Sequence, residues 1–327
     1  MAIPEKKPYE RLSDYLERTL PGELEAGKSR GKATADIIAK FNEPPAREMF
    51  APFIWGATNA SGSAGGGGSD VDANAYIAEV IAVGGTLSAG DKTAIQELYS
   101  NLKTDSLYTK IKYMYPFMGG TADAHSVEGI QPTDVNYTIS WKNNISGSSA
   151  HTSAGVDCTS NNGVGVINLS PNDIHSSVDD ITLGGYVSTA VTNDQGFLIG
   201  SNIINTQRYN FLTPFDSNNV YIGLGRDNFA IYDNTVAPVG RWIGSRTSST
   251  DLQLYKNGSS VVTQTTSNAG ATLSTDFVVF FNLRFAAPLS NPFNGVCGFI
   301  FGADGLNGTE VSTLDGHLST FLTAIGR

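Results

Sequence analysis

The sequence has few of the features that mark disulfide-rich or membrane-spanning proteins. Only two cysteines, Cys158 and Cys297, occur among 327 residues. They are too few for a disulfide framework, so we expect two small buried thiols, with one bridge between them as the alternative. No run of about 18 apolar residues is present and the first residues lack an apolar signal core, so we expect neither a membrane span nor a signal peptide.

Basic residues are also scarce. The chain has 21 Lys and Arg against 31 Asp and Glu, a net charge of −10. Proteins that coat nucleic acid or anionic membranes neutralise phosphates with Lys and Arg, so we expect neither among the partners. Glycine, by contrast, is abundant, with 36 residues, and 10% of the residues are aromatic, a composition typical of short strands and tight turns.

The charge distribution divides the chain near residue 60. Residues 1–60 carry nine basic and nine acidic side chains, so the net negative charge comes from the rest of the chain. A glycine- and serine-rich tract follows, and we assign residues 61–71 as a flexible linker. Residues 1–60 are too few to build a core of their own, so we interpret them as a charged helical anchoring arm.

An aromatic cluster closes this arm. We expect it to be buried, either against the rest of this chain or against a partner protein. The anchoring candidates are Met49, Phe50, Phe53, Ile54 and Trp55.

The stretch GELEAGKS, residues 22–29, matches the phosphate-binding pattern G-x-x-x-x-G-K-[ST]. A working phosphate loop follows a hydrophobic strand, whereas an amphipathic helical pattern and Pro21 precede this one. Glu23 and Glu25 would place negative charge beside the phosphates. We therefore interpret the stretch as a loop between two helices and expect no nucleotide cofactor.

Residues 72–120 have helical periodicity and predict a three-helix collar. Asp72 is the expected N-cap of the first helix, and Gly84 and Gly85 end it. Ser88 with Asp91 predicts a capping box for the second helix. The third is expected to run over 107–115 up to Pro116.

Residues 121–327 predict a β-sandwich head, because the apolar period changes to two from about Val135 onward. Short runs rich in β-branched and aromatic residues alternate there with Gly, Asn, Asp and Ser. The dipeptide Asn257-Gly258 predicts a hairpin. Asn307 with Glu310 predicts the start of a C-terminal helix whose apolar stripe packs on the sandwich.

The stretch LQLYKNGSSVV and the later run FVVFFNLRF look like parts of a concanavalin A-like or laminin-G-like jelly roll. More specifically, three stretches resemble virion structural proteins of Bacteroidota-infecting bacteriophages, including crAss-like phages. They are ANAYIAEVIAVGGTLSAGDKTAIQELYSNLK, YTKIKYMYPFMGGTADAHS and FIFGADGLNGTEVSTLDGHLSTFLTAIGR. The likeness spans about residues 72–327. It departs from the family at Val127-Glu128-Gly129, where a basic residue and Asn-Leu are usual.

The resemblance implies a non-enzymatic particle component located in the virion, and no catalytic residues come with it. No E-x-D-x-x-E triplet of a sandwich glycosidase is present. The four His are scattered, so we expect surface or hydrogen-bonded residues rather than zinc ligands. Residues 303–310 resemble a calcium loop, but Leu306 stands where an oxygen ligand is required. We expect no metal and no cofactor.

The expected partners are other virion proteins and further copies of this chain, as a trimer or pentamer. The alternative is a lectin-like adhesin head that binds a host glycan or receptor. Aromatic faces stack on sugars, and Arg, Asp and Asn bind hydroxyl groups. Under this alternative the candidate glycan-binding residues are Arg226, Asp227, Asn228, Arg241 and Trp242; the competing interpretation makes Trp242 a core residue.

Overall fold

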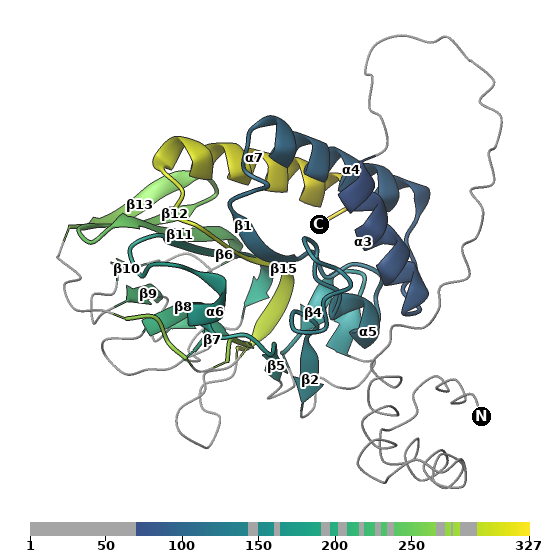
Figure 1. Cartoon of the computed structure of the whole chain (residues 1–327), viewed down its shortest axis with the longest axis horizontal. Helices are drawn as coiled ribbons and strands as arrows, with labels where there is room; N and C mark the ends of the chain where they lie inside the picture. Colours follow the sequence, from purple (N-terminus) through teal and green to yellow (C-terminus); the bar gives the residue numbers. More distant parts are fainter. Residues whose placement is uncertain are drawn as a thin grey trace, which may run out of the picture. The chain divides into compact units, whose positions relative to one another are not determined.

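The computed structural model describes residues 70–142, 150–159, 164–190, 197–201, 208–215, 219–225, 230–233, 239–265, 272–275, 277–281 and 293–327 (Figure 1). They belong to one compact unit, Gly65–Arg327. The predicted arm, with its candidates Met49 to Trp55, lies outside the described residues. So do the candidates Arg226, Asp227 and Asn228.

Two antiparallel sheets form the centre of this unit. The 8-stranded sheet has the order β13 (Ser259–Gln264), β12 (Asp251–Lys256), β11 (Gly240–Ser248), β6 (Ile181–Ala190), β15 (Gly295–Ala303), β4 (Gly155–Asp157), β3 (His151–Thr152), and β1 (Ile111–Tyr115) also pairs with β15. The 7-stranded sheet has the order β10 (Ala230–Asp233), β9 (Asn219–Gly225), β8 (Arg208–Phe215), β7 (Phe197–Gly200), β14 (Val279–Phe280), β5 (Val164–Val166), β2 (Ser140–Lys142).

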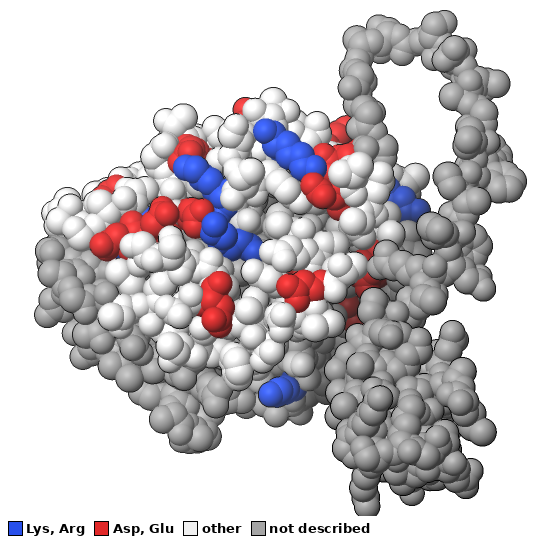
Figure 2. Space-filling model, viewed as in Figure 1, with Lys and Arg blue, Asp and Glu red and all other residues white. Residues whose placement is uncertain are grey.

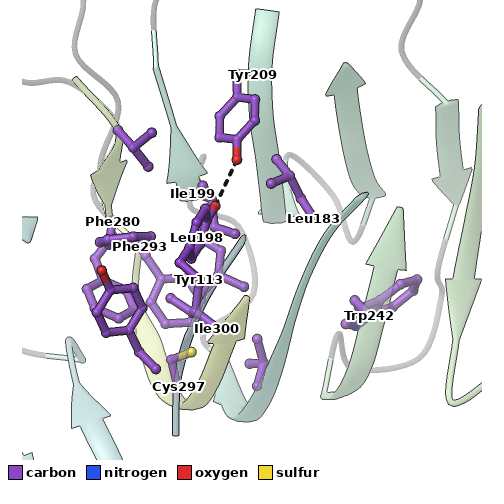
Figure 3. Packing of buried hydrophobic residues seen from close by; sticks show 14 of the residues in the cluster. Tyr113, Leu183, Leu198, Ile199, Tyr209, Trp242, Phe280, Phe293, Cys297 and Ile300 are labelled. Atoms are coloured by element: carbon purple, nitrogen blue, oxygen red, sulfur yellow. Dashed lines mark hydrogen bonds between the residues drawn. The ribbon is translucent and has the colours of Figure 1, made fainter. Parts of the chain in front are cut away.

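The two sheets share one hydrophobic core. Leu183 and Ile300 of the larger sheet pack in the same buried cluster as Ile199 and Ile222 of the smaller one. This core is what the period-two pattern predicts, because alternate residues of each strand point to the same side. Figure 3 shows part of this packing. The mainly β, sandwich-like architecture predicted from the sequence is therefore confirmed.

A tyrosine pair crosses this core. The hydroxyl groups of Tyr113 on β1 and Tyr209 on β8 lie 3.0 Å apart, as the dashed line in Figure 3 marks. His175 Nε2 lies 3.0 Å from the same Tyr209 hydroxyl. Both tyrosines are almost completely buried. The row of hydrogen bonds therefore gives a partner to each tyrosine hydroxyl group, which would be costly to bury alone.

Helices cover the other face of the larger sheet. They are α3 (Val71–Ala82), α4 (Ala89–Thr104) and α7 (Gly308–Ala324), and Figure 1 shows α4 and α7 running side by side. Their apolar stripes form a second buried cluster with Phe299, Phe301 and Ile243 of the sheet. The predicted C-terminal helix and its packing on the sandwich are confirmed. None of the described helices is long and apolar enough to cross a bilayer.

Local capping signals give most of the helix boundaries. Ser88 and Asp91 form the predicted capping box of α4, and Asn307 and Glu310 form that of α7. Gly84 follows α3 with φ 88°, as a C-terminal glycine does. The N-cap of α3 is Asp70 rather than the predicted Asp72, which lies inside the first turn. Two further short helices are α5 (Ala122–His125) and α6 (Pro171–Ile174).

The predicted third collar helix is wrong. Residues 111–115 form strand β1, paired with β15. Tyr113 and Tyr115 enter the core between the sheets, whereas Ile111 and Met114 pack under the helices. A strand buried on both faces has an almost continuous apolar run, which helical periodicity also fits. Residues 72–120 thus supply two helices and one strand of the same unit.

Ion pairs fasten α7 and the segment before it. Lys110 binds Glu310 at 2.6 Å, and Lys112 of β1 binds Asp304 at 2.8 Å. On the face shown in Figure 2, basic and acidic side chains lie next to one another rather than in separate patches. Further along α7, Arg241 binds Asp315 and His317 binds Asp105. Helix α7 is therefore bound to its neighbours both at its start and at its middle.

Candidate functional site

The guanidinium group of Arg327 joins four separate chain segments. Its Nε donates to the Ser153 carbonyl at 2.9 Å. Its Nη1 donates to the carbonyls of Pro116 at 3.1 Å and Gly298 at 2.8 Å, and Nη2 donates to that of Phe117 at 2.7 Å. Four of the five N–H groups of the side chain are thus used. We call this set of bonds the Arg327 hub.

The hub brings together two of the three stretches that carry the sequence resemblance. YPFMGGTADAHS supplies the carbonyls of Pro116 and Phe117, and the C-terminal stretch supplies Arg327. Burial lowers the pKa of Arg327, and the charge of Asp91 is among the influences that oppose this shift. Sequence reasoning missed Arg327 as a site residue, because no local pattern shows which carbonyls a terminal arginine reaches.

A pocket of about 300 Å³ lies beside the hub, and we call it the Arg327 pocket. Its polar lining consists of Thr86, Asp91, Ser153 and Arg327. Its remaining lining consists of Met118, Gly119, Gly120 and Ile325. The pocket therefore combines one side-chain carboxylate, one guanidinium and two hydroxyl groups with an apolar surface.

Helix α4 and a glycine turn position these groups. Asp91 is at the third position of α4, and its Oδ2 accepts from the Ser88 backbone N–H at 2.8 Å. Gly119 has φ 88°, and a Cβ there would lie 2.8 Å from the Ala124 Cβ. The Thr86 N–H donates to the Gly119 carbonyl at 3.1 Å, so the turn is fixed against the segment that leads into α4.

The glycan-binding assignment of Trp242 is wrong. Trp242 has an exposed fraction of 0% and packs in the core between the sheets, so neither face of its ring is open to a sugar. Lys256 Nζ lies 4.9 Å from the centre of its ring. In-facing and out-facing residues alternate along a strand, and β11 places Trp242 on the inner side.

Arg241 is on the outer side of β11, but it is already engaged. Its Nε and Nη2 donate to the two carboxylate oxygens of Asp315 at 2.8 and 2.9 Å. Such a forked pair fixes the orientation of both side chains. In this structure Arg241 holds α7 on the sheet, and the structure does not bring it together with Trp242 at a surface.

The histidines are hydrogen-bonded or ion-paired, as expected. His125 and His151 are buried, with their Nδ1 atoms 3.0 Å apart. Burial lowers the pKa of His125 well below its usual value, and the neighbouring His151 lowers it further. Burial also lowers the pKa of His175, to about 3. Within the described ranges, no three His, Cys, Asp or Glu side chains form a group that could hold a metal ion.

Both cysteines are buried and free, as the first of the two sequence alternatives predicts. Cys158 donates its N–H to the Gly295 carbonyl at 2.8 Å, while Cys297 lies opposite Val156. Cys158, which directly follows β4, and Cys297 of β15 are therefore diagonal rather than directly opposite. Diagonal neighbours lie further apart than a disulfide requires.

Glu128 marks the place where the sequence departs from the resembled family. The side chain is buried, with an exposed fraction of 1%. Its Oε1 accepts from the Met114 N–H at 2.7 Å, and its Oε2 accepts from the N–H groups of Ile130 and Gln131. Burial raises the pKa of Glu128 to about 7, and these N–H groups oppose the rise by stabilising the charged form. The carboxyl group joins β1 to the loop that follows α5.

We expect Glu128 to make the stability of the protein depend on pH. Its pKa is 4.5 unfolded and about 7 folded. Between these values the folded state holds the proton and the unfolded state does not. Its stabilising contribution is thus complete below pH 4.5 and is lost as the pH rises through about 7. The loss amounts to at most about 3 kcal/mol.

Urea unfolding at several pH values, for the natural chain and Glu128→Gln, measures this contribution. The difference in unfolding free energy between the two proteins isolates Glu128, because the buried histidines contribute equally to both. We expect this difference to change between about pH 4.5 and 7 and to level off above. Equal pH dependence in the two proteins would contradict the assignment.

Comparison with known proteins gives weak structural likenesses. No family model matches the chain, and no curated protein matches it in sequence. A solved structure described in connection with cell entry of botulinum neurotoxin type C through two ganglioside molecules has a TM-score of 0.36 and 14% identity, over 48% of this chain and 40% of that one. The binding domain of botulinum neurotoxin DC, solved with rat synaptotagmin II, has a TM-score of 0.33 and 11% identity, with coverage of 48% and 40%.

Domain 4 of an extracellular GH43 arabinanase from Geobacillus stearothermophilus, solved with arabinotriose, has a TM-score of 0.45 and 12% identity. The match covers 63% of this chain and 98% of that domain. The present chain thus spans less than half of the neurotoxin chains but nearly all of the arabinanase domain. Since all three TM-scores are below 0.5, these likenesses assign no function to this protein.

Proposed function

We propose that this protein is a non-enzymatic structural component of a bacteriophage virion, such as a spike, fibre or vertex protein. Residues 1–60 attach it to other virion proteins and to further copies of the chain, and a head with jelly-roll connections is displayed. The sequence resemblance supports this proposal. The structural observation that supports it is a group of hydrogen bonds and ion pairs at Asp70, the first of the described residues.

The entry point is fixed to the helical layer by a small network, which we call the entry network. Asp70 caps α3 and binds Lys103 of α4 at 2.8 Å. Lys103 also binds Asp72 at 2.6 Å. The Asp70 N–H donates to Gln96 Oε1 at 2.7 Å. Burial opposes the ionisation of Asp70, but the hydrogen bond from Lys103 holds the pKa of this carboxyl group below its usual value.

The entry network suits a protein held by its N-terminal arm. A pull on the residues before Asp70 acts on α3 and α4 together, because Lys103 and Gln96 connect them. Without these bonds the same pull would unwind α3 from its first turn, since the N–H groups of a first turn have no partner within the helix. A single partly exposed ion pair contributes little, whereas a cap and several bonds at one point act jointly.

A second candidate function is a lectin-like head that binds a glycan or receptor. The Arg327 pocket favours it, because a preformed hollow whose apolar lining carries a few polar groups is a common form of ligand site. Weak contacts at such a site become useful when many copies are displayed together. The two functions are compatible, since an attachment protein of a particle needs both an anchor and a recognition surface.

Paired substitution in the full chain tests the anchoring function. We expect the natural chain to form closed homo-oligomers and the variant with Phe53→Ser and Trp55→Ser to be a monomer, because serine cannot supply the apolar area that the proposed contact between copies needs. Light scattering measures the mass in both cases. Val71→Ser, which changes a residue with an exposed fraction of 74% outside the aromatic cluster, is the control and should leave the mass unchanged.

A monomeric natural chain would overturn the anchoring function. Release of sugars from polysaccharide by the purified protein, with turnover, would overturn its non-enzymatic character. In either case the sandwich fold stands, since it depends on the buried cores and not on the arm.

A further inference from the structure

We propose that the Arg327 pocket binds one unit of a neutral, hydroxyl-rich ligand, that is, a single sugar residue of a glycan. The inference deepens the second candidate function and rests on it. It is independent of whether residues 1–60 anchor the chain. Its evidence is the unused hydrogen-bonding capacity, the charge balance and the rigidity of the lining.

The polar groups of the pocket have capacity to spare. One oxygen of Asp91 accepts from Ser88, and the other accepts no hydrogen bond from the described residues. One of the five N–H groups of Arg327 is likewise left over by the four bonds of the hub. The hydroxyl groups of Thr86 and Ser153 are exposed, and within the described part of the chain neither is hydrogen-bonded.

This set of groups matches sugar hydroxyls. A hydroxyl group both donates and accepts, so it can donate to the free oxygen of Asp91 and accept from the free N–H of Arg327. The Thr86 and Ser153 hydroxyls can take either role. A ligand with several adjacent hydroxyls satisfies all four groups at once, whereas a ligand with a single polar group leaves most of them unpaired.

The charges of the lining select a neutral ligand. Asp91 and Arg327 are the charged lining residues, and they carry opposite charges. An anion would be attracted by Arg327 but repelled by Asp91. A cation would be attracted by Asp91 but repelled by Arg327. Because these two side-chain charges oppose each other, neither kind of ion gains an advantage over its hydration in water. A neutral polar ligand loses less on leaving water.

The size and rigidity of the pocket also fit. Its volume of about 300 Å³ is at the lower end of the range for small-molecule sites, which suits one ring rather than an extended chain. Gly119 and Gly120 leave its wall without side chains, and the Arg327 hub fixes that wall in place. Met118 and Ile325 supply apolar surface for the C–H groups of a sugar ring.

Amide spectra of the isotope-labelled full chain test the inference. The probes are D-glucose, D-galactose, D-mannose, L-rhamnose and N-acetyl-D-glucosamine, each titrated to about 50 mM, since single sugar units bind weakly. We expect at least one sugar to shift the amide signals of Thr86, Gly119, Gly120 and Ser153 in a saturable way. Sodium acetate and ammonium chloride at the same concentration are expected to leave them unshifted.

Two variants and a control locate the site. Ser153→Leu fills the pocket, yet it keeps the hub, because Arg327 binds the backbone carbonyl of Ser153. Asp91→Asn retains an oxygen for the capping box but removes the free carboxylate oxygen. We expect both variants to bind the sugar about tenfold more weakly or worse. Ser176→Leu, at an exposed serine outside the pocket, should bind as the natural chain does.

The possible failures have different meanings. If no sugar shifts the pocket signals, or if acetate or ammonium shifts them equally, the inference is overturned. If a sugar binds but Ser153→Leu and Asp91→Asn retain its affinity, the pocket is overturned while a glycan-binding head stands. The oligomer measurement on Phe53→Ser with Trp55→Ser decides the anchoring function separately.

Discussion

Replacing Arg327 by methionine is expected to lower the free energy of unfolding by about 3 kcal/mol, although this residue lies beyond the end of α7. Its guanidinium group donates to four carbonyl oxygens from three other parts of the fold: 116–117, 153 and 298. Methionine matches the aliphatic stem of arginine and has no donor. It therefore removes the partner of the three part-buried carbonyls, those of Pro116, Phe117 and Gly298, and an unsatisfied carbonyl away from water is costly.

Urea unfolding of Arg327→Met, Arg327→Lys and Lys92→Met separates the hub from simple loss of charge. Arg327→Lys keeps the charge but not the planar fork, so we expect it to recover only a minor part of the loss. Lys92→Met removes an exposed positive charge and should change the free energy of unfolding by less than about 0.5 kcal/mol. A comparably small effect of Arg327→Met would show that the hub does not stabilise the fold.

Adding one methyl group at Gly244 is expected to destabilise the protein by about 2–3 kcal/mol. Gly244 is on β11, and a Cβ there would overlap the Cδ1 of Ile222 on β9 of the opposite sheet and lie 2.8 Å from its Cγ1. Ile222 is completely buried, so it has no free space into which to move. The glycine therefore sets how closely the two sheets approach at this point.

A double-mutant cycle tests this packing. Ile222→Val removes the overlapping methyl group and alone costs about 1 kcal/mol. Combined with Gly244→Ala it should recover much of the loss, so the two effects should not be additive. Gly316→Ala in α7 is the matched control, because a Cβ there would have nothing within 4 Å apart from its chain neighbours and the backbone of its own helix, and alanine favours a helix. It should stabilise the protein by about 0.5–1 kcal/mol. Additive effects of Gly244→Ala and Ile222→Val would contradict the proposed contact.

These experiments also bear on the proposed functions. The Arg327 hub forms one wall of the pocket, so a loss of stability in Arg327→Met should be accompanied by changed amide signals at Gly119 and Gly120. Gly244 is in the core between the sheets, so its variant should leave the pocket signals unchanged. If the fold is rigid, only the substitution next to the pocket should change the amide signals of the pocket.

Features that depend on near neighbours in the chain could be predicted from the sequence. Ser88 with Asp91, and Asn307 with Glu310, form capping boxes because side chain and backbone groups three residues apart bind each other. Asn257 and Gly258 have φ values of 48° and 76° and turn β12 into β13, as their dipeptide predicts. The strands could be predicted for the same reason, because the alternation of buried and exposed residues is a property of each strand by itself.

Features that depend on distant parts of the chain were decided only by the tertiary structure. Residues 111–115 have a helical pattern, but pairing with β15, almost 190 positions later, makes them a strand buried on both faces. Trp242 faces inward because of the position of β11 in the sandwich. Glu128 is buried where its carboxyl group accepts a hydrogen bond from β1. Arg327 acquires its role from carbonyls up to 211 positions away. Local hydrogen bonds can be inferred from spacing along the chain, whereas these contacts exist only once the sheets and helices have packed together.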